Sequence, residues 1–148
     1  MDDLSARVRL FVYRRFIDGG RAPSPSEIGA AFGLMPLAVE KMLRRLQADD
    51  DALVLLPGSP YVWMAEPFSA VATSYLVRSS GHEWFGNCVW DGLGILALAD
   101  HDGQVETWCP ASGVPLRLDV RTRRLEPGAS VVHFAVPARR WWESIGYT

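Results

Sequence analysis

The residues best suited to chemistry are Cys88 and Asp91, which lie three positions apart in the segment NCVWDGLG. On a helical turn, positions three apart face the same side, so the thiol and the carboxyl group can converge. A thiolate is a strong nucleophile and a ligand for soft metals, and a carboxyl group can take or give a proton. The spacing predicts a catalytic thiol–acid pair, although a single cysteine in an apolar run is more often a small buried hydrophobe.

Aromatic side chains surround this pair in the sequence. Trp84, Phe85 and Trp90 are predicted to bind the substrate. An apolar setting would raise the pKa of the Asp91 carboxyl group, whereas a helix N-terminus would favour the thiolate of Cys88.

The remaining candidate residues are scattered. Cys109 follows Cys88 by 21 residues, and we expect it either to join Cys88 as a soft-metal ligand or to be structural. Among the histidines, His133 is assigned to substrate binding if its strand lies beside the site, with a structural imidazole as the alternative. His82 could approach in the same way, and His101 is predicted to be solvated. The sequence has no Cys-x-x-Cys zinc spacing, no phosphate-binding glycine loop and no nucleophile elbow.

Composition excludes several classes of protein. The 148 residues are 49% hydrophobic and 22% charged with a net charge of -2, which excludes disorder as the main state. No apolar run reaches the roughly 18 residues needed to span a membrane. The acidic amino terminus lacks the pattern of a signal peptide, so we expect a cytoplasmic protein with free thiols.

The first half of the chain is predicted to contain three helices and a hairpin. Apolar periodicity predicts a helix over residues 3–17. Ser24 and Glu27 form a capping box that opens a second helix, which ends at Gly33. A third helix begins at Pro36. The expected acidic loop is 49–51, and strands 52–56 and 61–64 flank the turn at 57–60.

Three helices followed by a hairpin are typical of a winged-helix domain, whose third helix would carry Lys41, Arg44 and Arg45 toward DNA. Residues 1–64 are electrically neutral, which argues against DNA as a partner.

The second half is predicted to be mainly strands, at 105–109, 115–120 and 130–136, after a connector at 66–78. We therefore expect an α+β fold. A winged-helix-like subdomain (1–65) would pack on a catalytic subdomain with a small mixed or antiparallel sheet (66–148). The aromatic tail, with Trp141, Trp142 and Tyr147, is expected to join the core and part of a dimer contact, in a monomer or homodimer.

Three segments together resemble the alkylmercury lyase (organomercurial lyase) family: NCVWDGLG, CPASGVPL that begins 21 residues after Cys88, and VVHFA near the end. The similarity extends over roughly residues 20–140. It implies an enzyme without a cofactor in which two cysteines bind mercury and an acid protonates the leaving carbon. The products are a hydrocarbon and Hg(II), which free thiols remove.

The resemblance assigns Cys88 to the first catalytic cysteine, Asp91 to the acid and Cys109 to a structural cysteine. Ala129 stands where the family's second catalytic cysteine is expected, and the chain ends before an expected carboxyl-terminal helical segment. Three hypotheses follow. The chain cleaves carbon–mercury bonds with Cys109 or an external thiol as replacement. Alternatively, it catalyses metal-free lyase, hydrolase or cyclase chemistry on a small organic molecule, or it is a non-enzymatic binder or regulator.

Overall fold

The computed structural model of the chain describes residues 3–50, 53–128, 131–134 and 136–143. The elements are α1 (Asp3–Gly19), α2 (Pro25–Phe32), α3 (Pro36–Asp50), β1 (Leu53–Leu55), β2 (Val62–Ala65), β3 (Phe68–Ser69), β4 (Tyr75–Ser79), β5 (His82–Gly86), α4 (Val89–Ala99), β6 (Gly103–Trp108), β7 (Pro115–Arg121), β8 (Arg124–Leu125) and the 3-10 helix η1 (Ala138–Glu143). All the described strands join one antiparallel sheet in the order β1-β2-β3-β5-β4-β6-β7-β8. The fold is therefore α+β, as predicted.

The local signals for α1 and α2 are confirmed. Val8, Val12 and Phe16 form the fully buried face of α1. At the start of α2, the Glu27 backbone N–H donates to Ser24 Oγ at 3.2 Å, and the Ser24 backbone N–H donates to Glu27 Oε2 at 2.8 Å. These two bonds satisfy amides that the first helical turn leaves without partners.

The third helix extends further than predicted. Asp49 and Asp50 belong to α3, so the expectation of a loop at these two residues was wrong. A carboxylate at a helix C-terminus opposes the helix dipole. Here Arg45 Nε lies 3.2 Å from Asp49 Oδ2, one turn earlier, and this ion pair offsets the repulsion. No helix in the described part of the chain is both long and apolar enough to cross a membrane.

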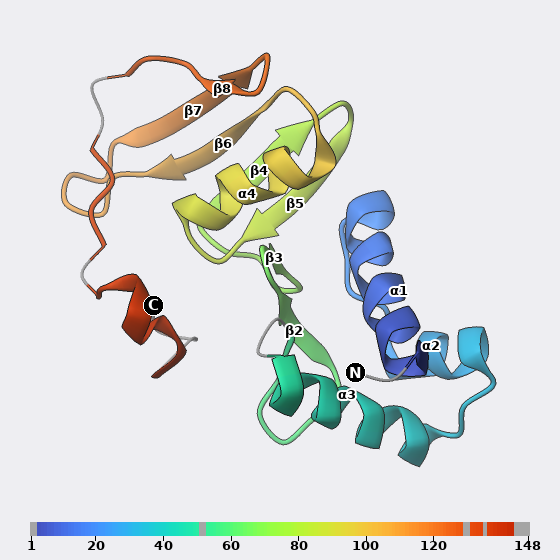
Figure 1. Ribbon diagram of the computed structural model, residues 1–148. Coiled ribbons are helices and arrows are strands. Elements are labelled where there is room, and N and C mark those ends of the chain that lie inside the picture. The colour runs from blue at the N-terminus through green and yellow to red at the C-terminus, as the bar shows by residue number, and fades with distance from the viewer. Residues whose placement is uncertain (1–2, 51–52, 129–130, 135, 144–148) are drawn as a thin grey trace.

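The predicted hairpin is present as β1 and β2, and its strands continue into the sheet of the second half. β2 pairs with β3, which pairs with β5. Figure 1 shows this sheet extending from α3 at one end to β8 at the other, with α4 over one face of β4, β5 and β6. The predicted boundary at residue 65 falls at the end of β2, and the division into two subdomains stays a prediction.

One hydrophobic core connects the two halves. The rings of Phe16 on α1 and Phe68 on β3 stack with centroids 5.2 Å apart. Trp84 on β5 is 2% exposed, and its indole Nε1 donates to the Phe16 carbonyl oxygen at 2.8 Å. The first helix is therefore fixed against the strand that leads into Cys88.

The end of the described chain differs from the prediction. Of the strand expected at 130–136, residues 131–134 and 136 form no strand, so this expectation was wrong for them. Val131 is 90% exposed, and the edge of β7 pairs with the short strand β8 instead. An alternating apolar pattern forms a strand only where a sheet edge accepts it. Ala129, Tyr147 and the side chain of Trp142 lie outside what the structure describes.

Candidate active site

The turn between β5 and α4 brings Cys88 and Asp91 together. Cys88 is the N-cap residue of α4, with an extended backbone (φ -147°), and Asp91 is the third residue of the helix. The predicted helical turn is thus present. Both side chains are half-buried, and they interact with each other.

Hydrogen bonds fix this turn to the sheet. The Asn87 backbone N–H donates to Asp91 Oδ2 at 3.1 Å, so the carboxyl group caps the start of its own helix. At Gly86, the residue before Asn87, the backbone carbonyl oxygen accepts a hydrogen bond from the Thr73 hydroxyl at 2.5 Å. The backbone N–H of Gly92 donates to the Cys88 carbonyl oxygen at 3.0 Å. These bonds hold the thiol and the acid on a rigid element.

Burial keeps both groups protonated to higher pH than usual. It raises the pKa of the Cys88 thiol from 9.0 to about 11, and the negative charge of Asp91 adds to the effect. The backbone N–H groups of Asp91 and Trp90 favour the thiolate but do not outweigh burial. Burial also raises the pKa of Asp91, while contacts with Asn87 and Cys88 lower it in part. At neutral pH the site therefore holds a thiol rather than a thiolate.

Two further polar side chains adjoin the pair. Burial raises the pKa of the Tyr75 phenol, and the charge on Cys88 adds to this rise, which places Tyr75 near the thiol. The Asn87 amide is close enough to Asp91 to favour its carboxylate. Neither amide atom of Asn87 makes a hydrogen bond of standard geometry within the described residues, and both are shielded from solvent.

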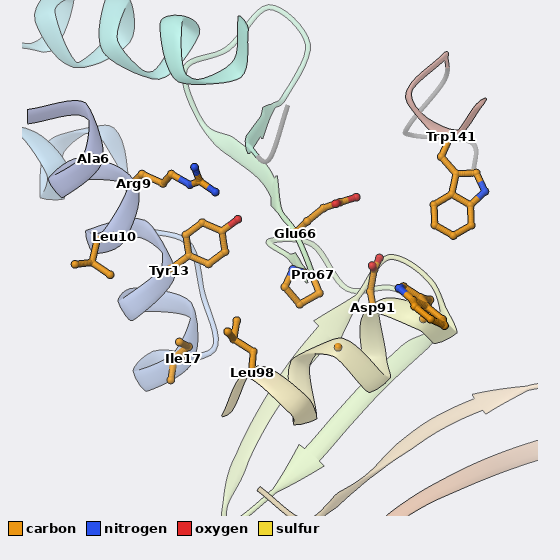
Figure 2. A pocket seen from close by; sticks show the side chains of 12 residues that line it. Ala6, Arg9, Leu10, Tyr13, Ile17, Glu66, Pro67, Asp91, Leu98 and Trp141 are labelled. Carbon is orange, nitrogen blue, oxygen red and sulfur yellow. The ribbon is translucent and has the colours of Figure 1, made fainter. Parts of the chain in front are cut away.

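Asp91 also lines a pocket of about 940 Å³ between α1 and α4. Figure 2 shows α1 on one side of the space and α4 on the other, with Glu66 and Pro67 above and Trp141 at the far end. The lining residues are Ala6, Arg9, Leu10, Tyr13, Ile17, Glu66, Pro67, Trp90, Asp91, Gly94, Leu98 and Trp141. Asp91 therefore touches the Cys88 thiol and also faces a space large enough for a small organic molecule.

The structure separates the predicted aromatic residues. Trp90 lines the pocket and is 64% exposed, whereas Trp84 is enclosed in the core. Phe85 lines a different pocket, with Leu76 and Leu116, because neighbouring residues of a strand point to opposite faces of the sheet. The alternation of side chains along a strand at 82–86 is the signal that separates Trp84 from Phe85.

His133 and Cys109 do not join the thiol–acid pair as close neighbours. His133 is exposed in the non-strand segment. Cys109 begins the turn between β6 and β7, and both cysteines are free. The hydroxyl and backbone N–H of Ser112, with the N–H of Ala111, lower the pKa of Cys109, opposite to Cys88. The described residues contain no cluster of three or more His, Cys, Asp or Glu side chains that could hold a metal ion.

Sequence reasoning missed the polar residues on the other side of the pocket. Arg9 lies over the ring of Tyr13, with its guanidinium carbon 5.8 Å from the ring centroid. Burial raises the pKa of Glu66, and the charge of Asp91 raises it further. In the sequence, Arg9 and Tyr13 look like ordinary residues of an amphipathic helix, so nothing local marks them as pocket residues. For Glu66, the local signal of an unusual position is the proline that follows it.

Comparisons with known proteins concern the fold and the family of the chain. The crystal structure of the mercury-bound form of MerB2 has a similar fold, with a TM-score of 0.66 at 19% sequence identity. The match covers 86% of this chain and 60% of that one, so this chain spans about three fifths of that protein. A comparison with curated protein sequences finds no match. The family model for alkylmercury lyase, MerB, matches residues 68–148, which is more than half of the chain, and the protein therefore belongs to the alkylmercury lyase family.

Proposed function

We propose that the protein is a lyase that cleaves carbon–mercury bonds by protonolysis, with Cys88 as the mercury ligand and Asp91 as the proton carrier. The observation that carries the proposal is the first turn of α4, where a protonated thiol and a carboxyl group interact at the edge of an organic-sized pocket. Soft sulfur selects mercury, and no cofactor is needed.

The reaction begins with an organomercury compound held by an external thiolate, RHg–SR′. Mercury bonds to Cys88 Sγ, and the thiol proton moves to the Asp91 carboxylate. Asp91 then gives this proton to the carbon atom as the carbon–mercury bond breaks. The bonding electrons stay with carbon, so RH leaves and mercury remains Hg(II) between Cys88 and R′S⁻.

Turnover requires a second external thiol. Its sulfur replaces Cys88 on mercury, its proton returns to Cys88, and Hg(SR′)₂ leaves. The external thiol supplies the second sulfur, since position 129 is alanine. The Cys109 thiol is instead engaged with its own turn, through Ser112.

Mercury binding and metal-free nucleophilic attack both use the thiolate, so either reaction needs a base for the Cys88 proton, and Asp91 is the base in contact with it. In protonolysis the thiol proton is consumed in the reaction, so a protonated resting thiol is useful. A DNA-binding regulator has less support, because Arg44 and Arg45 on α3 pair with Glu40 and Asp49.

A single-turnover assay tests the proposal. Phenylmercury is mixed with the protein and excess free thiol, and benzene is measured in the headspace. We expect benzene from the unaltered protein, none from Cys88→Ser, and a rate lower by about 10²–10⁴-fold from Asp91→Asn, which removes the general acid. Asp91→Asn should still bind mercury.

Two further outcomes decide between alternatives. Cys109→Ser should keep its benzene release if the external thiol supplies the second sulfur, and should lose it if Cys109 does. No benzene from a folded protein whose Cys88 reacts with a thiol reagent would refute the lyase proposal. The search should then move to metal-free substrates.

A further inference from the structure

Asn87 presents two amide groups to the Asp91 carboxyl group, one from its backbone and one from its side chain. The backbone N–H donates to Asp91 Oδ2 at 3.1 Å, and the side-chain amide lies beside the same carboxyl group. Figure 2 shows the Asp91 carboxyl group extending from the start of α4 into the pocket. One residue next to the thiol thus supplies two groups that can fix the orientation of the acid.

The side-chain amide of Asn87 has an unusual setting. Both of its polar atoms are shielded from solvent, and neither makes a hydrogen bond of standard geometry within the described residues. A shielded amide without a well-formed hydrogen bond destabilises a fold, because it has lost its contacts with water. Polar groups that break the rule of full hydrogen bonding are expected mainly at functional sites. The amide of Asn87 therefore calls for a role in the chemistry of its neighbour.

N–H donors control where a carboxyl group carries its proton. An oxygen that accepts N–H groups stays free of the proton, so the proton resides on the other oxygen. The side of the Asn87 amide that faces a carboxylate must be its N–H group, because two oxygen atoms repel each other. N–H donors also favour the carboxylate over the acid, which helps a carboxyl group release its proton to carbon.

We propose that Asn87 is a positioning residue whose backbone and side-chain N–H groups hold Oδ2 of Asp91, so that Oδ1 carries the proton from Cys88 Sγ to the leaving carbon. The proposal rests on the proposed lyase function. The S–H proton moves to Oδ1, and the O–H bond breaks as the C–H bond forms, while the carbon–mercury electrons stay with carbon. Asn87 itself takes and gives no proton. Its hydrogen bonds strengthen when Asp91 becomes a carboxylate, because hydrogen bonds to charged groups are stronger.

Asn87→Leu tests the role of the side chain, because leucine has a similar size and shape but no N–H group. In single-turnover assays with phenylmercury, the limiting rate of benzene release should fall about 10–10²-fold, the size of one hydrogen bond to a charged group. The concentration at half-saturation should change less than about twofold, because Cys88 still binds mercury. The variant should unfold at an equal or higher urea concentration, because it removes a shielded amide.

Gln47→Leu is the matched control, since it removes an amide that has a structural partner. Gln47 Oε1 on α3 accepts the backbone N–H of Leu55 on β1 at 2.7 Å. This variant should unfold at a lower urea concentration and keep its rate of benzene release within about twofold. An unchanged rate in Asn87→Leu, or an equal loss of rate in both variants, would overturn the proposal.

A double-variant cycle shows whether Asn87 acts through Asp91. In a protein that already carries Asp91→Asn, adding Asn87→Leu should lower the remaining rate by less than about twofold, because the acid that Asn87 positions is gone. Equal effects of Asn87→Leu in the two backgrounds would refute the assignment, since Asn87 would then act elsewhere.

An infrared measurement involves no mercury and so separates failure of this proposal from failure of the lyase function. At mildly acidic pH, subtracting the spectrum of Asp91→Asn from that of the unaltered protein isolates the carboxyl C=O band of Asp91. The same subtraction in the Asn87→Leu background should place this band at higher wavenumber, because the C=O oxygen has lost a hydrogen bond. An unmoved band would overturn the positioning role. If the band moves but the unaltered protein releases no benzene, the lyase proposal fails while the contact between Asn87 and the acid stands.

Discussion

A Cβ atom added to Gly86 would lie 3.2 Å from the Cβ atom of Asp91 and 2.8 Å from the backbone nitrogen of Gly92. The last residue of β5 is thus packed directly against the first turn of α4. Real Cβ atoms do not approach a backbone nitrogen so closely, so only glycine permits this distance. The missing side chain at position 86 allows the acid to sit beside the thiol.

Replacing Gly86 with alanine should therefore push the start of α4 off the sheet. We expect a loss of about 1–3 kcal/mol in the free energy of unfolding, as for other overpacked sites. Benzene release should fall as well, because the added methyl group meets the backbone of Asp91 itself. Urea denaturation and the single-turnover assay measure the two effects.

Gly94→Ala is the matched comparison for this substitution. Its new Cβ atom would meet Pro67 at an ordinary 3.4 Å, and alanine favours a helix over glycine by up to about 1 kcal/mol. Its stability should be equal or higher. Equal stability of Gly86→Ala and the unaltered protein would show that the turn can relax around the added methyl group.

The two thiols should react at different pH. In a Cys109→Ser variant, the rate of Cys88 alkylation by iodoacetamide should keep rising up to about pH 10, because its pKa is about 11. In Cys88→Ser, the rate for Cys109 should level off at lower pH, since hydrogen bonds from Ser112 lower its pKa. Adding Asp91→Asn to the first variant should move the Cys88 profile to lower pH, because a neighbouring negative charge is removed. An unchanged profile would mean that the two groups do not interact.

Asp91 should make the protein less stable as pH rises. Its folded-state pKa is raised by burial, so its contribution to stability is complete below the unfolded pKa of roughly 3.9 and is lost as pH rises through the folded value. Asp91→Asn removes this titration. Its stability relative to the unaltered protein should therefore improve from about pH 3 to about pH 7 in urea titrations.

Asp119 provides a control of opposite sign. Arg117 lowers the pKa of Asp119, so its contribution is present above the unfolded pKa and is lost as pH falls. Asp119→Asn should therefore lose stability relative to the unaltered protein as pH rises over the same range. The same pH trend for both variants would contradict the assigned shifts.

The separation of Trp84 from Trp90 can also be tested. Trp84→Phe removes the hydrogen bond to the Phe16 carbonyl group and leaves a small void, so the free energy of unfolding should fall by about 1–3 kcal/mol. Trp90→Phe, at a residue 64% exposed, should change it by about 0.5 kcal/mol or less. Its effect should instead appear in benzene release, because Trp90 lines the pocket beside Asp91. A stability loss of equal size for both would contradict the placement of Trp84 in the core.

Local sequence signals predicted the elements that depend on neighbours in the chain. The capping box of Ser24 and Glu27 and the buried stripe of α1 are confirmed, because caps and helical faces depend on residues three or four positions apart. The prediction that the third helix ends before Asp49 was wrong, because the ion pair with Arg45 offsets the unfavourable interaction of the Asp49 carboxylate with the helix dipole. The late strand was wrong over 131–134 because pairing depends on a free sheet edge, which no local pattern reports.

The spacing of Cys88 and Asp91 predicted that the thiol and the carboxyl group can converge, because residues three apart on a helical turn share a face. The groups that surround this pair come from tertiary packing. The placement of α1 opposite α4 leaves a pocket between them, and this pocket brings Arg9, Tyr13 and Glu66 to the same space as Asp91, from positions more than 20 residues away in the chain. Burial then raises the pKa of both reactive groups, because the low-polarity surroundings come from contacts between distant segments.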